Sequence, residues 1–217
     1  YIIAFNKITG KPLWKKYRDE NTTWSTPLAL EVDGKMQVIV NASNFIRSYD
    51  AKSGDIIWQC SGQTVNAIPT PVSGMGMVFC TSGFRGNALQ AIVLGRTGDL
   101  SATDAIRWQV NEDTPYVPSP LLYDDKLYVY SHNKAILSCY QASTGKAHFV
   151  AQALEGLRSV YASPVGAAGR VYCVGRNGTT QVIKQSDVFE VLATNSLDDP
   201  IDASPAIVGD QIFLKGK

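Results

Sequence analysis

Two short patterns recur along this chain at nearly the same interval, and they constrain its fold more than any other feature. The first is a Thr-Gly or Ser-Gly pair followed by a large aromatic residue, and the second is a Ser or Thr directly before a proline. The first occurs at Thr9-Gly10 with Trp14, Ser53-Gly54 with Trp58, Thr97-Gly98 with Trp108, and Thr144-Gly145 with Phe149. The second occurs at Thr26-Pro27, Thr70-Pro71, Ser119-Pro120, Ser163-Pro164 and Ser204-Pro205. Two independent patterns with one period indicate a tandem repeat.

The glycines are 44, 44 and 47 residues apart, and the prolines are 44, 49, 44 and 41 apart. Each interval holds short runs of β-branched and aromatic residues separated by polar turns, which is typical of β-propeller blades with four antiparallel strands. We therefore predict one all-β propeller domain over residues 1–217 with about five blades. The predicted blades cover approximately residues 25–60, 68–110, 118–151 and 162–193, with residues 1–17 and 204–217 as the fifth.

The residues of the first pattern have a structural explanation. Glycine adopts the positive φ that a tight turn requires, and a large aromatic residue on an outer strand buries enough area to join two blades. We expect structural docking roles for Gly10, Trp14, Gly54, Trp58, Gly98, Trp108, Gly145 and Phe149.

Charge and cysteine content exclude several classes of protein. The 20 Lys and Arg balance 19 Asp and Glu, which argues against a nucleic-acid partner. No apolar run is long enough for a membrane span. The four cysteines have no C-x-x-C spacing, so we predict no metal site and expect them to pack in the core.

Residues suited to catalysis are sparse. His132 is expected in a loop and His148 on an outer strand, and neither belongs to a metal-binding or nucleophile motif. We therefore predict no catalytic residue and lean toward a non-enzymatic role.

Binding residues are expected on one face of the propeller. The loops before each first strand and between the second and third strands lie at the same end of every blade. Aromatic residues, amides and arginines in these loops suit a protein or glycan partner. The candidates are Trp24, Asn66, Arg85, Tyr116, Tyr161 and Arg176.

Three segments resemble the tryptophan-docking motif of pyrroloquinoline-quinone-like (PQQ-like) propeller repeats. They are Ala4-x-Asn6-x-x-Thr9-Gly10-x-x-x-Trp14, Ser48-Tyr49-Asp50-x-x-Ser53-Gly54-x-x-x-Trp58 and the weaker Cys139-x-Gln141-x-x-Thr144-Gly145-x-x-x-Phe149. This family includes quinoprotein alcohol dehydrogenases and BamB-type lipoproteins of outer-membrane barrel assembly. The resemblance covers nearly the whole chain and is greatest to secreted bacterial PQQ-like repeat proteins, so it implies a periplasmic or extracellular location.

The resemblance leaves two functions open. One is a non-catalytic scaffold for a protein or glycan partner, and the other is part of a quinoprotein-type dehydrogenase whose cofactor site lies mostly outside this chain. In the dehydrogenases, the quinone lies between a tryptophan and a disulfide of adjacent cysteines, and Glu, Asn and Asp hold a calcium ion. No two cysteines are adjacent here, and the densest acidic group, Asp198, Asp199 and Asp202, falls in a predicted loop. We expect no PQQ, calcium or other cofactor and favour the scaffold.

The resemblance also bears on the number of blades. Rings of this family usually have seven or eight blades, so we expect this chain to form part of such a ring. The alternative is a closed five-bladed ring in which residues 1–17 and 204–217 share one blade.

Overall fold

The computed structural model describes all residues, 1–217, and contains strands and loops with no helix. The chain therefore has no helix that could cross a membrane. Four sheets contain a complete set of four antiparallel strands, and a two-stranded sheet lies at each end of the chain. The prediction of an all-β chain with four-stranded blades is confirmed.

We number the four full blades I to IV in chain order. Blade I has β3 (Leu28–Val32), β4 (Lys35–Val40), β5 (Ile46–Asp50) and β6 (Ile56–Cys60), and blade II has β7 (Val72–Gly74), β8 (Met77–Ser82), β9 (Ala88–Val93) and β11 (Ile106–Val110). Blade III has β12 (Leu121–Tyr123), β13 (Lys126–Tyr130), β14 (Ile136–Gln141) and β15 (Ala147–Ala153), and blade IV has β16 (Val165–Ala167), β17 (Arg170–Val174), β18 (Thr179–Lys184) and β19 (Val191–Ser196). The half-blades are β1 (Ile2–Phe5) with β2 (Pro12–Lys16), and β20 (Ala206–Val208) with β21 (Gln211–Phe213).

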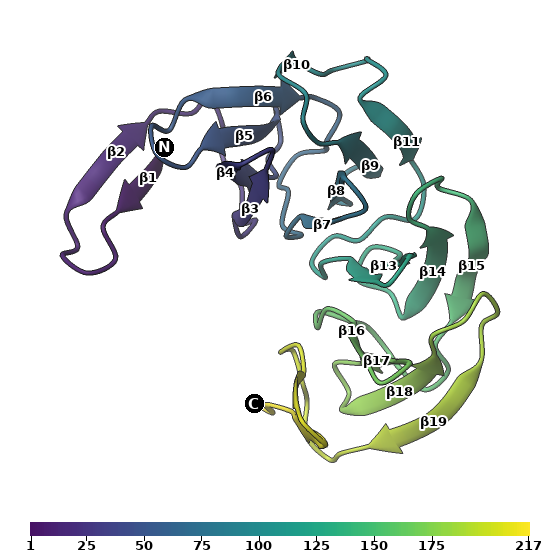
Figure 1. Cartoon of the computed structure of the whole chain (residues 1–217). Helices are drawn as coiled ribbons and strands as arrows, with labels where there is room; N and C mark the ends of the chain where they lie inside the picture. The colour runs from purple at the N-terminus through teal and green to yellow at the C-terminus, as the bar shows by residue number, and fades with distance from the viewer.

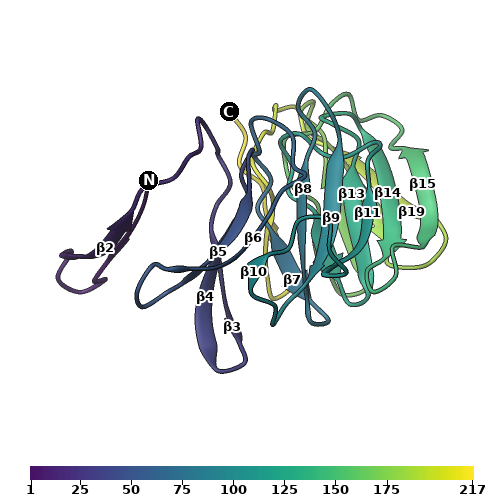
Figure 2. The ribbon, with the colours of Figure 1, turned by 90° about the horizontal axis from the view of Figure 1, so that it is seen from above.

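The blades follow one another around an open arc (Figure 1). The first strand of each full blade lies toward the centre of the arc and the fourth lies on the outside, and the blades stand side by side when viewed from above (Figure 2). The two half-blades lie at opposite ends of the arc and form separate sheets. Residues 1–17 and 204–217 therefore do not share a blade in this structure. The closed five-bladed alternative is not formed.

The outer strand of blade IV extends beyond its predicted bounds. The predicted blade covers residues 162–193, whereas β19 runs from Val191 to Ser196. Phe189 precedes the strand and packs edge-on against Phe149 of blade III, with ring centroids 5.4 Å apart. Its aromatic character therefore reflects packing between blades rather than a place in the strand.

The hydrophobic core lies between the blades. In β8 all residues are buried, and successive side chains face opposite neighbours. Val78 and Cys80 pack with blade I, whereas Met77 and Phe79 pack with blade III. A third cluster joins blades III and IV. Strands that are buried on both faces carry the nearly continuous apolar runs that the sequence shows.

Tryptophans of two blades dock on the glycine turn of the next blade. Trp14 Nε1 donates a hydrogen bond to the Ala51 carbonyl (3.0 Å), and Trp108 Nε1 donates one to the Ala142 carbonyl (2.8 Å). A Cβ on Gly54 would lie 2.6 Å from the Trp14 ring, and one on Gly145 would lie 2.7 Å from the Trp108 ring. These glycines therefore provide space for an indole as well as a positive φ.

The third copy of the turn departs from this arrangement. In the other copies the aromatic residue lies four residues after the glycine, whereas Trp108 lies ten residues after Gly98, which indicates an insertion. The inserted segment begins with β10 (Gly98–Asp99), which pairs in parallel with β6 of the preceding blade, Gly98 opposite Trp58. Leu100 follows this strand and joins the core between blades I and II. The Trp58 indole N–H is buried without a hydrogen-bond partner, and nothing lies within 4 Å of a Cβ on Gly98. A Cβ on Gly98 would thus meet no indole, and Trp58 packs instead in the core between blades I and II.

The residues of the second pattern link consecutive blades. The Thr70 N–H donates to Ser119 Oγ, the Ser119 N–H to Ser163 Oγ, and the Ser163 N–H to Ser204 Oγ, each at 2.9 Å. We call this row the serine belt. It precedes the innermost strands and explains why a small hydroxyl residue recurs before proline.

Candidate functional site

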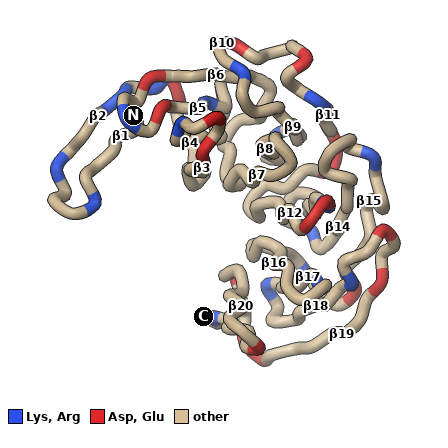
Figure 3. Tube along the Cα trace, in the orientation of Figure 1, with Lys and Arg blue, Asp and Glu red and all other residues tan.

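The candidate residues lie on the face of the arc formed by the loops that enter each first strand and the loops between second and third strands. We call it the ligand face. Acidic and basic residues are interspersed along the chain (Figure 3). Contacts that reach across blades therefore depend on hydrogen bonds and ring packing as well as on charge.

Four of the six candidates belong to one continuous set of contacts. Trp24 Nε1 donates a hydrogen bond to Asn66 Oδ1 (2.8 Å), and Asn66 Nδ2 donates one to the Tyr116 hydroxyl (3.0 Å). Tyr116 stacks on Phe84, with centroids 4.9 Å apart and an interplanar angle of 24°. The Arg85 guanidinium lies 5.3 Å from the Phe84 ring centroid. We call Trp24, Asn66, Phe84, Arg85 and Tyr116 the aromatic cluster.

Local backbone conformation helps to position the aromatic cluster. Asn66 has a φ of 61°, which asparagine tolerates well, and its N–H donates to Ser43 Oγ at 2.9 Å. Arg85 has a φ of 53°, an uncommon value for a long side chain. Trp24 is 66% exposed and Arg85 is exposed, so the cluster presents an indole and a guanidinium to solvent.

The segment that leads to Trp24 is tied to blade I. The buried Arg47 contacts Asp19 at 2.5 Å, and this hydrogen bond lowers the pKa of Asp19. The Glu20 carboxylate accepts hydrogen bonds from the backbone N–H groups of Asn44 (2.9 Å) and Phe45 (3.0 Å). These contacts fix the loop and therefore the direction in which Trp24 leaves it.

The other two candidates form a second group. Arg176 makes two hydrogen bonds to Asp202, at 2.6 and 3.3 Å, and its guanidinium lies 4.0 Å from the centroid of the Tyr161 ring. Lys217 Nζ lies 3.0 Å from the same carboxylate. Arg176, with a smaller contribution from Lys217, lowers the pKa of Asp202 to about 2. We call Tyr161, Arg176 and Asp202 the ion-pair cluster.

The sequence analysis missed Phe84, which connects Arg85 to Tyr116. Its only sequence signal is its position next to Arg85 in a loop already assigned to this face. The stacking partner lies 32 residues away in the entry loop of the next blade. Only the packing of two loops on neighbouring blades reveals it.

The two histidines lie at opposite ends of blade III. His132 is in the loop between β13 and β14 on the ligand face. His148 is near the start of β15, where it lies 3.2 Å from Gln141 Oε1 and 3.5 Å from Asp187. They therefore cannot act on one substrate atom.

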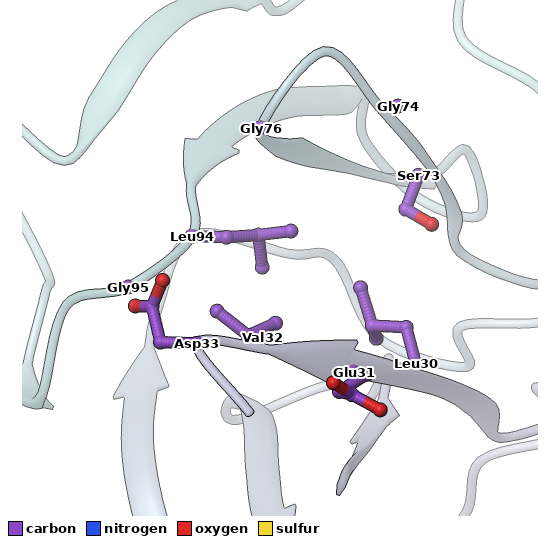
Figure 4. A pocket seen from close by; sticks show the side chains of 9 residues that line it. All are labelled: Leu30, Glu31, Val32, Asp33, Ser73, Gly74, Gly76, Leu94 and Gly95. Carbon is purple, nitrogen blue, oxygen red and sulfur yellow. The ribbon is translucent and has the colours of Figure 1, made fainter. Parts of the chain in front are cut away.

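A shallow pocket of about 390 Å³ lies on the opposite face, between the inner hairpins of blades I and II (Figure 4). Its polar side chains include Glu31, Asp33 and Ser73, and Leu94 forms part of its apolar wall. A Cβ on Gly95 would lie 3.1 Å from the Asp33 carboxylate, so this residue leaves room for the acid. None of the candidates from sequence lines this pocket.

The blade architecture, the docked tryptophans and the serine belt define the chain as a β-propeller built from PQQ-like repeats. The sequence profile of the family described as "Outer membrane protein assembly factor BamB" matches residues 95–215, more than half of the chain. The chain belongs to this family.

The chain is also similar to two solved structures. BamB from Moraxella catarrhalis is 14% identical, with 99% of this chain and 75% of that chain covered and a TM-score of 0.49. The quinohemoprotein alcohol dehydrogenase from Comamonas testosteroni is 13% identical, with 92% of this chain and 40% of that chain covered and a TM-score of 0.65. The present chain thus spans less than half of the dehydrogenase, and the likeness shows the fold alone. No curated protein sequence matches the chain.

Proposed function

We propose that this chain is a non-catalytic binding scaffold of the bacterial cell envelope and that its ligand face holds a protein partner. The observation that carries the proposal is the aromatic cluster, which places Trp24, Tyr116 and Arg85 together on three neighbouring loops. Tryptophan, tyrosine and arginine are the residue types that contribute most to binding energy at protein interfaces. The hydrogen bonds across blades arrange them before a partner arrives, which lowers the entropic cost of binding.

The family supports an envelope location and a protein partner. Its description is that of an assembly factor for outer-membrane proteins. We propose the periplasm or the cell exterior as the location of this chain, with a protein of the envelope as its partner.

A quinoprotein dehydrogenase is the alternative, and the residues present do not fit its cofactor. The sandwich that the resemblance implies needs two adjacent cysteines facing the ligand. Cys60, Cys80, Cys139 and Cys173 are fully buried in the clusters between blades, and burial raises the pKa of Cys139 and of Cys173 to about 12. These thiols pack as small apolar groups, so none of them reaches a ligand.

Site-specific photocrosslinking in cells tests the scaffold. A photoreactive amino acid at Arg85 should capture one discrete partner, because Arg85 is exposed beside the aromatic cluster. The same group at Lys184, an exposed residue at the far end of β18, is the control. Equal products from both positions would contradict a specific ligand face.

The dehydrogenase alternative has its own test. Purified protein is mixed with saturating PQQ and Ca²⁺, and the melting temperature is measured. A scaffold should show no shift, whereas a clear rise would favour the dehydrogenase.

A further inference from the structure

A second recess lies on the ligand face, between the loops that enter blades I and II. Its volume is about 410 Å³, within the range of small-molecule sites. Five of its seven lining residues are neutral and polar: Asn21, Thr22, Ser43, Asn44 and Asn66. The other two are Val65 and Phe84. We call it the amide pocket.

The lining selects for one kind of ligand chemistry. Each asparagine side chain offers both a donor and an acceptor, and each hydroxyl can serve as either. A charged ligand would find no opposite charge among the lining residues, and an apolar ligand would find only Val65 and Phe84. Sugar hydroxyls also donate and accept, and sugar rings carry apolar C–H faces that suit a nearby aromatic wall. The amide pocket therefore matches a neutral saccharide.

Part of the amide pocket is held rigid by existing contacts. Three hydrogen bonds hold Asn66. Its backbone N–H donates to Ser43 Oγ, its Oδ1 accepts from the Trp24 indole, and its Nδ2 donates to the Tyr116 hydroxyl. Phe84 is held by its stack on Tyr116. A ligand would therefore meet walls that need little reorganisation.

Other groups of the amide pocket are free to bind. The exposed side chains of Asn21 and Thr22 make no hydrogen bond within the chain. Asn44 Nδ2 donates a hydrogen bond to the Asp19 carbonyl, and Asn44 Oδ1 accepts none within the chain. The Trp24 indole lies just beyond Asn66 and exposes most of its surface. It offers a flat apolar surface next to the pocket for a second sugar ring.

We propose that the amide pocket binds a neutral saccharide, with Asn21, Thr22 and Asn44 contacting ring hydroxyls and Phe84 forming the apolar wall. The inference goes beyond the protein partner proposed above. It places a small-molecule site beside the aromatic cluster, and it stands or fails independently of that partner.

Saturation-transfer NMR with maltose, cellobiose and N,N′-diacetylchitobiose tests the proposal. At about 10 mM, at least one disaccharide should receive magnetisation, since small polar ligands of this size bind weakly. Glucuronic acid and the uncharged peptide Ala-Ala-Ala, blocked at both ends, are measured in parallel. No signal from any neutral sugar, or a stronger signal from the peptide, would overturn the proposal.

Two substitutions locate the site without disturbing the fold. Asn21→Ala and Thr22→Val remove side-chain groups that make no internal hydrogen bond, so melting should be unchanged while transfer to the sugar falls at least fivefold. Asn195→Ala, in the exposed strand β19, is the matched control and should leave transfer unchanged. Equal transfer in all three variants would show that the sugar binds elsewhere. Crosslinking from Arg85 should persist in Asn21→Ala, which separates this result from the test of the scaffold.

Discussion

Gly10, Gly98 and Gly145 hold the same place in the repeated turn, but only Gly145 has an indole ring against it. All three have positive φ, at 69°, 85° and 74°. A Cβ at Gly145 would lie 2.7 Å from Trp108, whereas nothing lies within 4 Å of a Cβ at the other two. The comparison therefore separates the cost of backbone conformation from the cost of displacing a docked ring.

Alanine at these three glycines should give two different losses of stability. Gly10→Ala and Gly98→Ala should each lower the free energy of unfolding by about 1–2 kcal/mol, the cost of a left-handed conformation. Gly145→Ala should cost about 1–3 kcal/mol more, because Trp108 must move. Urea denaturation measures all three. Equal losses would mean that the Trp108 contact contributes nothing.

The ion-pair cluster should make stability depend on acid pH. Because the Asp202 pKa is about 2 in the folded chain and 3.8 is its ordinary value, the stabilisation is present above about pH 4 and is lost as pH falls through about 2. Arg176→Gln should remove this part of the acid-induced decrease in melting temperature. Arg96→Gln, which breaks the exposed contact to Asp104, is the control. A parent-like decrease between pH 4 and 2 in Arg176→Gln would contradict this assignment.

Some of these residue contacts could be predicted and others could not. The position within the repeat places Trp24, Asn66, Arg85, Tyr116, Tyr161 and Arg176 on the same face, because equivalent positions in each blade lie at the same end of the sheet. The partition into two clusters, and the part played by Phe84, depend on side-chain contacts between loops of different blades. No short sequence pattern predicts side-chain contacts between loops of different blades.

At the scale of elements, blades II, III and IV are each attached to the unit that follows by a backbone N–H and a serine hydroxyl. The serine belt uses Ser119 and Ser163 as both donor and acceptor, so each joins two neighbours at once. These hydrogen bonds stabilise the arc in addition to the apolar area buried between the sheets. Each contributes a small free energy, but the contribution repeats at consecutive blades.

Removal of one hydroxyl should expose one amide. In Ser163→Ala the Ser119 N–H loses its acceptor, so its hydrogen exchange should accelerate while the Thr70 N–H, bound to Ser119 Oγ, stays protected. The free energy of unfolding should fall by about 1–2 kcal/mol. Ser186→Ala, which removes only a local contact to the Val188 carbonyl, is the control. Unchanged exchange at Ser119 would exclude the belt as a stabilising contact.

Element positions followed well from sequence where apolar runs and polar turns agree, as in β13 and β17, which lie inside the predicted blades 118–151 and 162–193. The long spacing between Gly98 and Trp108 indicates an insertion. It does not indicate that the inserted residues pair with β6 of another blade, because a two-residue parallel strand has no sequence signature. That pairing is a contact between two blades, which no local pattern predicts.

At the scale of the whole molecule, the two clusters on the ligand face lie on different parts of the arc. The aromatic cluster spans the loops that enter blades I, II and III, and the ion-pair cluster spans those that enter blade IV and the last half-blade. A partner large enough to cover the face would contact both.

Paired substitutions should map the footprint of the partner. Trp24→Ala with Arg85→Ala, and Tyr161→Ala with Arg176→Ala, should each weaken binding about tenfold or more, as expected for residues of the interface-favoured types. Melting temperature should change little in the Trp24 and Arg85 pair, because these two side chains are exposed, and should fall slightly at neutral pH in the Tyr161 and Arg176 pair, because the ion pair to Asp202 is lost. Binding is titrated with the partner isolated through the Arg85 crosslink. Parent-like affinity in both double variants would place the partner on another face.

The architecture followed from the repeat, but the shape of the arc did not. Both a larger ring and a closed five-bladed ring satisfy the same spacing of prolines and glycines. Which of the two rings the spacing leads to depends on the small rotation between adjacent sheets. That rotation depends on how side chains such as Phe79 and Trp108 fill the space between two sheets. Rotations of this kind accumulate along the arc and are not encoded at any one position.

The serine belt also bears on how such a chain can change in length over evolution. Every link runs in the same direction, with the N–H of one blade donating to the hydroxyl of the next. A duplicated unit therefore brings one donor and one acceptor, and it restores the bond on both of its sides without any compensating substitution. Gain or loss of whole units leaves this linkage intact, whereas an insertion within a unit, such as the one that forms β10, leaves Trp58 without its usual partner.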